Sequence, residues 1–213
     1  MIDTPSYTSF NDHTRIASGS LPVNALAVKQ AMKSGAQGPL LTFCDQTGHV
    51  VDIDLRGSDA QILARLITDE AHLQEGDSEH IDTKDSMTTR GPGRPKLGVI
   101  AREVTLLPRH WDWLGSQPGG ASVTLRKLID EARKANEERD RQRRAIESAY
   151  HFMSTMAGDM ASFEDASRAL FANDMTKLRQ YADAWPTDIR DYLWRLVLTA
   201  DTGLPVLTTS PGA

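Results

Sequence analysis

A polar, acidic stretch in the first half of the chain most limits what this sequence can fold into. Residues 74–89 read QEGDSEHIDTKDSMTT and contain almost no side chain that a hydrophobic core would accept. Such a stretch cannot bury enough apolar surface to offset the entropy that ordering it would cost. Residues 90–97, RGPGRPKL, follow, and their glycines and prolines disfavour helix and strand alike. We therefore predict a flexible linker at residues 74–97 that divides the chain of 213 residues.

The part before the linker, residues 1–73, has the pattern of a small α+β domain. Residues 6–20 favour an early strand or hairpin that turns near Asn11-Asp12. Residues 22–34 favour a helix, because proline suits a first helical position and apolar residues recur with helical spacing. The predicted apolar stripe of this helix consists of Val23, Leu26, Ala27 and Ala31.

Two more strands and a second helix complete this predicted domain. LLTFC at 40–44 and HVVDIDL at 49–55 flank a glycine-containing turn, which is typical of a β-hairpin. Ser58 and Gln61 then have the spacing of a capping box, which predicts that a helix begins there.

The part after the linker predicts one strand followed by helices. Residues 99–107, VIAREVTLL, favour a strand, and the proline at 108 favours a helix start. After a Pro-Gly-Gly break, a second helix is predicted to be capped by Ser122 and to continue through a polar middle supported by oppositely charged side chains four residues apart. Three shorter helices follow, and residues 201–213 are predicted to be a disordered tail. The predicted fold class is α+β, with a strand–helix–helix unit at 98–135 that runs into a mostly helical region at 136–200.

The charge of the chain is distributed unevenly. The net charge is −5, but Arg90 to Arg144 contain thirteen basic and seven acidic residues, a net of +6, which leaves −11 for the remainder. A basic middle in an acidic protein indicates a local anionic partner, such as a nucleic acid. Solvated helix faces are the alternative explanation for the same charges.

Gly93-Arg94-Pro95 resembles the core of an AT-hook, a peptide that binds the minor groove of A·T-rich DNA. That groove is narrow, has a strongly negative potential and admits an extended chain. Glycine permits close approach of the backbone, and proline keeps the chain extended. The resemblance implies that Arg94 lies in the groove and that Arg90 and Lys96 lie near phosphates. A stiff linker is the alternative.

The next segment, EVTLLPRHWDWL followed by GGASVTLRKLIDEARK, resembles a ribbon-helix-helix unit. In that family two chains pair their strands into one ribbon that enters the major groove, and the second helices hold phosphates at their N-termini. The resemblance implies a homodimer. The residues expected to bind nucleic acid here are Arg102, Arg109, Ser122 and Thr124. The residues expected at the dimer interface are Val104, Leu106, Trp111, Trp113 and Leu128.

The strand register at residues 102–107 stays open. If Leu107 faces the core, the groove face carries Arg102, Val104 and Leu106, and in the other register it carries Glu103 and Thr105 instead. Neither register offers the row of polar or basic side chains that usually reads base edges. Direct readout of bases is therefore not predicted.

Four segments of the chain are distinctive: GRPKLGVIAREVTLLPRHWDWL, GGASVTLRKLIDEARK, YHFMSTMAGDM and an AWP-containing helix. Together they resemble a bacterial family known only as domain of unknown function 2239. The resemblance covers nearly the whole chain. It implies a bacterial source and a shared architecture, but no activity and no site residues.

No pattern in the sequence assigns a nucleophile, a general base or a metal site. Asp52 and Asp54 share one face of a predicted strand without a third ligand, and His72 and His80 match no compact zinc spacing. We expect no enzyme, no cofactor and no metal. Cys44 is the only cysteine, so no internal disulfide can form, which fits a cytoplasmic protein.

Two functional hypotheses remain. The first is a dimeric DNA-binding protein, a transcriptional regulator or a nucleoid-associated factor, supported by the basic middle and the two resemblances. The second is a protein–protein interaction or assembly module whose C-terminal helices dock a partner and whose basic helix is plain solvated surface. The apolar groove face favours the second hypothesis.

Overall fold

The computed structural model describes residues 5–75 and 102–202, and it confirms the α+β fold class. The chain forms two compact units. Unit 1 combines residues 1–74 with residues 137–213, and unit 2 spans residues 75–136. The predicted linker lies outside the described residues except for its first two, which belong to a helix, and the predicted tail lies outside them beyond residue 202.

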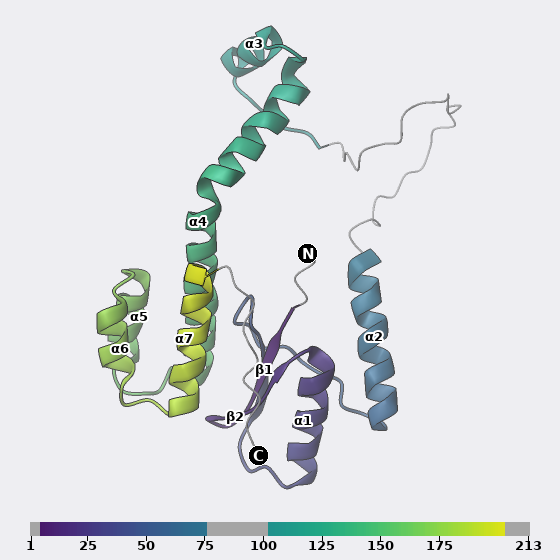
Figure 1. The fold of residues 1–213 in the computed structure, drawn as a ribbon, viewed down its shortest axis with the longest axis vertical. Coiled ribbons are helices and arrows are strands. Elements are labelled where there is room, and N and C mark those ends of the chain that lie inside the picture. The colour runs from purple at the N-terminus through teal and green to yellow at the C-terminus, as the bar shows by residue number, and fades with distance from the viewer. Residues whose placement is uncertain (1–4, 76–101, 203–213) are drawn as a thin grey trace. The chain divides into compact units, whose positions relative to one another are not determined.

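Unit 1 contains an antiparallel sheet of three strands in the order β2-β1-β3 (Figure 1). The strands are β1 (Tyr7–Asn11), β2 (Thr14–Gly19) and β3 (Leu40–Cys44). The predicted first hairpin is confirmed, since β1 and β2 pair directly and Asp12 takes the left-handed conformation (φ 53°) that their tight turn requires.

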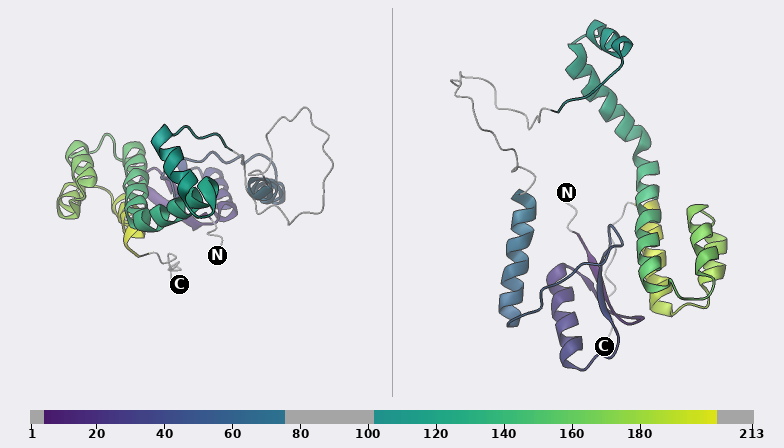
Figure 2. Two further views of the ribbon diagram at one scale, coloured as in Figure 1. Left: turned by 90° about the horizontal axis from the view of Figure 1, so that it is seen from above. Right: turned by 180° about the vertical axis from the view of Figure 1, so that it is seen from behind.

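Helices cover both faces of this sheet (Figures 1 and 2). α1 (Leu21–Lys33) lies on one face, and α2 (Asp59–Glu75) packs against α1 through Ile62 and Leu66. The other face meets the C-terminal part of α4 (Gly120–Met156) and α7 (Thr187–Thr202). The short helices α5 (Phe163–Phe171) and α6 (Met175–Ala182) complete the unit, so the predicted C-terminal helices are confirmed.

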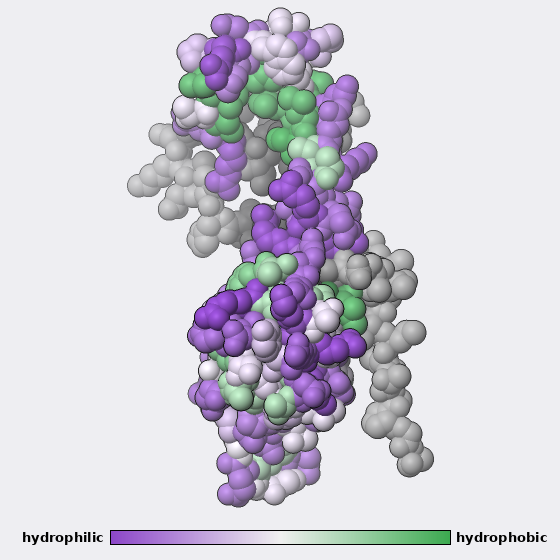
Figure 3. Space-filling model, turned by 90° about the vertical axis from the view of Figure 1, so that its left-hand side faces the viewer, coloured by the Kyte–Doolittle hydropathy of each residue, from purple (hydrophilic) through white to green (hydrophobic). Residues whose placement is uncertain are grey.

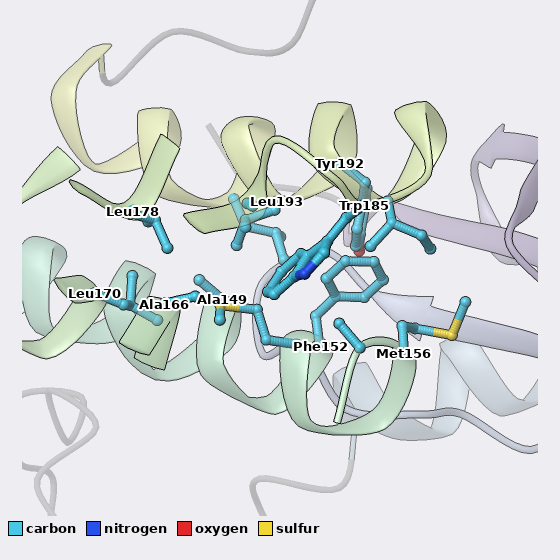
Figure 4. Packing of buried hydrophobic residues seen from close by; sticks show 14 of the residues in the cluster. Ala149, Phe152, Met156, Ala166, Leu170, Leu178, Trp185, Tyr192 and Leu193 are labelled. Atoms are coloured by element: carbon cyan, nitrogen blue, oxygen red, sulfur yellow. The ribbon is translucent and has the colours of Figure 1, made fainter. Parts of the chain in front are cut away.

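The main core of unit 1 joins segments from both ends of the chain. Phe10 and Phe43 of the sheet lie against Phe152 of α4 and Tyr192 of α7, with ring centroids 5.0 Å apart for Phe43–Phe152 and 4.5 Å apart for Phe152–Tyr192. Figure 4 shows Phe152, Tyr192 and Trp185 packed together, with Ala149 and Leu193 beside them. The sequence predicted residues 1–73 and the helices after residue 136 as separate regions. In the structure they share this one core.

The opposite face of the sheet is polar where it meets α1. Ser9 Oγ donates a hydrogen bond of 2.7 Å to Asn24 Oδ1 and lies 2.8 Å from Thr42 Oγ1, and all three residues are buried. The buried positions of α1 are Asn24, Ala25 and Val28. The predicted apolar stripe is wrong for Val23, which is 51% exposed. The side-chain amide of Asn24 donates hydrogen bonds to the carbonyls of Tyr7, Gly19 and Ser20. These bonds hold Asn24, rather than Val23, on the side of α1 that faces the sheet.

The predicted second hairpin at residues 40–55 is only partly formed. β3 is confirmed, but HVVDIDL makes one isolated bridge, between Val50 and Phe43, and no strand. Beyond this bridge, Asp54 lies at hydrogen-bond distance from Arg56 and at ion-pair distance from Arg65. The capping box is confirmed, since the Ser58 N–H donates to Gln61 Oε1 (2.8 Å) and the Gln61 N–H donates to Ser58 Oγ (3.3 Å).

The described part of unit 2 consists of an irregular segment, α3 (Pro108–Ser116) and the beginning of α4. The prediction that the second helix continues through its polar middle is confirmed, because α4 has 37 residues. The predicted strand is wrong over residues 102–107, which have no regular secondary structure within one chain, and its first three residues lie outside the described ranges. An isolated strand without a neighbour cannot satisfy its backbone groups.

Among the described residues, no helix is both long enough and apolar enough to span a bilayer.

Asp174 provides a test of the fold through pH. Its carboxylate accepts a hydrogen bond from the Lys177 N–H (3.0 Å) at the start of α6, and this bond holds the pKa of Asp174 below its usual value. A carboxyl with a lowered folded-state pKa stabilises the protein above its unfolded pKa, and this contribution is lost as the pH falls through the folded pKa. We expect Asp174→Ala to lower the urea midpoint at pH 7 and to have a smaller effect below about pH 4. Urea titrations of both proteins at several pH values measure this, and an equal difference at every pH would contradict the cap.

Candidate nucleic-acid interface

Glycine and proline set the corner between α3 and α4. Pro108 occupies the first turn of α3, where its missing N–H costs nothing, and Leu107 before it is extended (ψ 149°). Gly119 and Gly120 both have positive φ values, of 88° and 75°. A Cβ on Gly119 would also lie 3.2 Å from the side chain of Val123, so this corner favours glycine for two reasons. Local sequence therefore determines where α4 begins.

Ser122 does not cap α4, contrary to the prediction. The helix begins at Gly120, so Ser122 lies within its first turn. Its hydroxyl accepts a hydrogen bond from Arg126 Nη2 (3.1 Å), and its carbonyl accepts one from Arg126 Nε (3.1 Å). Gly119 and Gly120 have positive φ values, and the helix begins at Gly120, two residues before the predicted cap at Ser122. The capping preference of serine alone could not indicate this earlier start. Thr124, the other predicted phosphate anchor, is half-buried two residues further on.

Most basic side chains in the described part of unit 2 are exposed and lack an acidic partner among the described residues; Lys127, which lies 3.9 Å from Glu131, is the exception. Arg102 and Arg109 lie before and at the start of α3, and Arg109 has only a long contact of 3.5 Å with His110. Arg133 and Lys134 of α4 are also exposed and form no ion pair with a described residue. Further along α4 the pattern changes, since Arg141 lies 3.4 Å from Glu138 and Arg143 lies 3.2 Å from Asp140. The unpaired cations are therefore concentrated at residues 102–134.

Unit 2 also exposes large hydrophobic side chains, shown gathered over α3 and the start of α4 in Figure 3. We call these the apolar surface of unit 2. Trp113 is 50% exposed and Ile129 is 55% exposed, whereas Leu114 is the only buried residue between positions 102 and 136. The apolar surface of unit 2 consists of Val104, Leu107, Trp111, Trp113, Val123, Leu128 and Ile129.

The predicted site residues fall into three groups. Arg90, Arg94 and Lys96 lie outside the described residues. The remaining predicted nucleic-acid ligands, from Arg102 to Thr124, lie together in unit 2. Of the predicted interface residues, Leu106 is half-buried and the other four are exposed. Sequence reasoning left Leu107, Val123 and Ile129 out of this surface, and the four-residue spacing of Leu125 and Ile129 is the signal that indicates the last of them.

A second polar cluster lies in unit 1 and was not expected from the sequence. Asp45 follows β3, and its carboxylate accepts hydrogen bonds from Ser6 Oγ (2.6 Å), Thr8 Oγ1 (2.9 Å) and the hydroxyl of Tyr192 (2.7 Å). Arg195 also donates to this carboxylate and lies over the Tyr192 ring at 5.1 Å. Burial, with the nearby negative charge of Asp45, raises the pKa of Tyr192 above its usual range. None of the side-chain atoms of this cluster is among the described buried atoms that lack a hydrogen-bond partner, which fits a structural network.

The metal and acid–base candidates of the sequence can be compared with residues 5–75 and 102–202, which the structure describes. No group of three or more His, Cys, Asp or Glu side chains is placed there to hold an ion. Of the predicted carboxylate pair, Asp54 is occupied by Arg56, whose hydrogen bonds lower the pKa of that carboxyl far below its usual value. His80 lies outside the described residues.

The fold and the site define an α+β protein with a basic, partly apolar helical unit, and sequence comparison places it in a family. The model of the family described as an uncharacterised protein conserved in bacteria (DUF2239) matches residues 6–197. The chain belongs to this family, as its sequence indicated. No curated protein and no solved structure matches it. The resemblance to the ribbon-helix-helix family is not confirmed.

Proposed function

We propose that the chain is a dimeric DNA-binding protein of the bacterial cytoplasm, acting as a transcriptional regulator or nucleoid-associated factor rather than as an enzyme. The observation that carries this proposal is the concentration, between Arg102 and Lys134, of exposed cations that form no ion pair with a described residue, Lys127 excepted. They follow directly after the AT-hook-like peptide. A cation that is not already paired can neutralise a phosphate without first breaking an ion pair. Binding then gains from the release of counterions that the DNA had condensed.

The acidic remainder of the chain limits where DNA can lie. With a net charge of −11 outside Arg90–Arg144, that remainder repels a polyanion, so the proposed contact is confined to the basic middle. Arg94 would lie in the minor groove, and Arg102 and Arg109 would bind phosphates. Since these are mostly backbone contacts, the proposal includes a preference for A·T-rich groove shape and little direct readout of bases.

Arg94→Ala tests the minor-groove role. We expect it to weaken binding to an A·T-rich duplex about tenfold and binding to a G·C-rich duplex less. Arg168→Ala is the control, because Arg168 is also an exposed cation but lies in α5 and pairs with Asp165 at 2.8 Å. Fluorescence anisotropy with labelled duplexes at low salt measures both. If wild type and Arg94→Ala bind the A·T-rich duplex with equal affinity, Arg94 does not bind the minor groove.

A protein–protein assembly module without a nucleic-acid role is the second candidate. The specific observation in its favour is that Val104 is 54% exposed and Leu106 is half-buried in the segment that would face a groove. Side chains of this kind are better suited to a protein partner than to base edges. For this candidate, Arg94→Ala and Arg168→Ala are expected to behave alike in every assay.

A further inference from the structure

The described part of unit 2 has too little core to be stable by itself. Only Leu114 is buried between residues 102 and 136, and both hydrophobic clusters of the described chain lie in unit 1. Short helices are marginal in water, and most helical stability in proteins comes from packing an apolar face. α3 and the first turns of α4 leave their large apolar side chains exposed instead, including two tryptophans.

The exposed hydrophobic side chains are unevenly distributed along the chain. The seven residues of the apolar surface of unit 2 lie within positions 104–129. The exposed large hydrophobics of unit 1 are single residues spread over several elements, for example Met32 on α1, Ile67 on α2 and Phe171 on α5. Scattered exposed hydrophobics are normal for a folded surface, whereas a concentrated set marks an interaction site.

The area of this surface suits a pair of identical chains. If a tryptophan carries about 150–250 Å², an aliphatic side chain carries roughly 100 Å², and about half of each is exposed, the seven side chains offer roughly 450 Å² per copy, or about 900 Å² for a pair. That total approaches the roughly 1,000 Å² that a specific interface should exceed, and neighbouring polar residues add to it. Tryptophans are also the side chains that most often dominate the energy of such interfaces.

The charges of the same segment permit self-association. Residues 102–136 carry six basic and four acidic side chains, a net of +2, so two copies repel each other only weakly. The signs alternate in blocks along α4: Arg126 and Lys127 are basic, Asp130 and Glu131 are acidic, and Arg133 and Lys134 are basic again. A two-fold dimer uses the same patch on both copies, and this mixed pattern contains no block of one sign large enough to oppose it.

We propose that the apolar surface of unit 2 is buried against the same surface of a second copy, and that α3 and the first turns of α4 are stable only in that homodimer. The inference deepens the proposed function by naming the partner and its contact surface, and the dimer itself forms without DNA. Folding of this part of unit 2 is then coupled to association, so its stability depends on protein concentration while that of unit 1 does not.

Sedimentation velocity of the full chain without DNA, from about 0.1 to 100 µM, tests the dimer, together with hydrogen exchange of α3 and α4. We expect a dimer, with exchange protection at residues 108–136 that rises with protein concentration. Ile129→Asp should weaken the dimer at least about 100-fold, because a carboxylate would lose its water in the interface. Ile67→Asp is the matched control, since Ile67 is 62% exposed in the middle of α2 and should leave the dimer intact.

A chain that stays monomeric at 100 µM would overturn the inference, and so would an Ile129→Asp dimer as tight as the Ile67→Asp dimer. Unchanged thermal unfolding of unit 1 in both variants shows that the comparison is not one of misfolded protein. The proposed function is tested separately. A stable dimer that does not bind DNA would contradict the proposed function and support the inference. A monomer that binds DNA would contradict the inference and the dimeric state, and would support only the DNA-binding part of the proposed function.

Discussion

Gly48→Ala is expected to destabilise the protein by about 3 kcal/mol or more. Gly48 has a φ of 67°, and a Cβ at this position would lie 1.9 Å from the carbonyl oxygen of Ser148 in α4. The clash is with helix backbone, which cannot rotate away as a flexible side chain would. The next residue, His49, stacks on His151 of the same helix with ring centroids 3.9 Å apart. Alanine would therefore separate the turn after β3 from α4, which is one of the contacts that join the N-terminal and C-terminal parts of unit 1.

Gly35→Ala is the control for backbone strain. Gly35 has a similar φ of 79°, but a Cβ there would meet nothing within 4 Å. We expect this substitution to cost about 1–2 kcal/mol, the usual penalty for an L-residue in the left-handed region. Urea denaturation of both variants followed by circular dichroism measures the difference. Equal losses of stability would mean that the close approach of Gly48 to Ser148 contributes nothing.

Asp45→Ala is expected to cost about 3–5 kcal/mol, because it leaves the partly buried guanidinium of Arg195 without its counterion. The side chain of Asp45 is 10% exposed and that of Arg195 is 20% exposed, so water replaces little of the lost interaction. The hydroxyls of Ser6, Thr8 and Tyr192 lose their acceptor at the same time. Tyr192→Phe removes only one of these hydrogen bonds and should cost about 1 kcal/mol.

Asp54→Ala is the control for removing a carboxylate. Asp54 pairs with Arg56, whose side chain is 89% exposed, so water can take over when the carboxylate is lost. We expect its denaturation midpoint to stay close to that of wild type. If Asp45→Ala and Asp54→Ala shift the midpoint equally, the Asp45 network is not a stabilising element of unit 1.

Local signals predicted the local structure well. The hairpin at residues 6–20, the Ser58–Gln61 capping box and the helices of the C-terminal region each depend on residues a few positions apart. The contacts that failed to be predicted join distant positions. Tyr192 lies 147 residues from Asp45, and nothing in the spacing of either residue indicates that they meet. The burial of Asn24 could not be predicted for the same reason, because its hydrogen-bond partners Tyr7 and Gly19 lie on β1 and β2, outside its own helix.

The candidate site was predictable in its composition but not in its exposure. The cations and the apolar residues of unit 2 are visible in the sequence. The helical spacing of Leu125, Leu128, Ile129 and Ala132 predicts one apolar side of α4 that includes Leu128 and Ile129. An apolar stripe normally implies a buried face, however, and here both side chains are exposed in the single chain. The strand at residues 102–107 could not be judged by period alone, because a strand forms only where another strand supplies its hydrogen bonds.

DNA binding by the basic middle of the chain can be tested with a salt series. The affinity of the purified full-length chain for an A·T-rich and a G·C-rich duplex would be measured by fluorescence anisotropy between about 50 and 200 mM salt, where a contact to several phosphates loses affinity steeply. We expect micromolar or tighter binding at low salt, a linear fall of log affinity with log salt, and tighter binding to the A·T-rich duplex. Absence of binding to either duplex at low salt and micromolar protein would contradict DNA binding and leave the assembly module as the function to pursue.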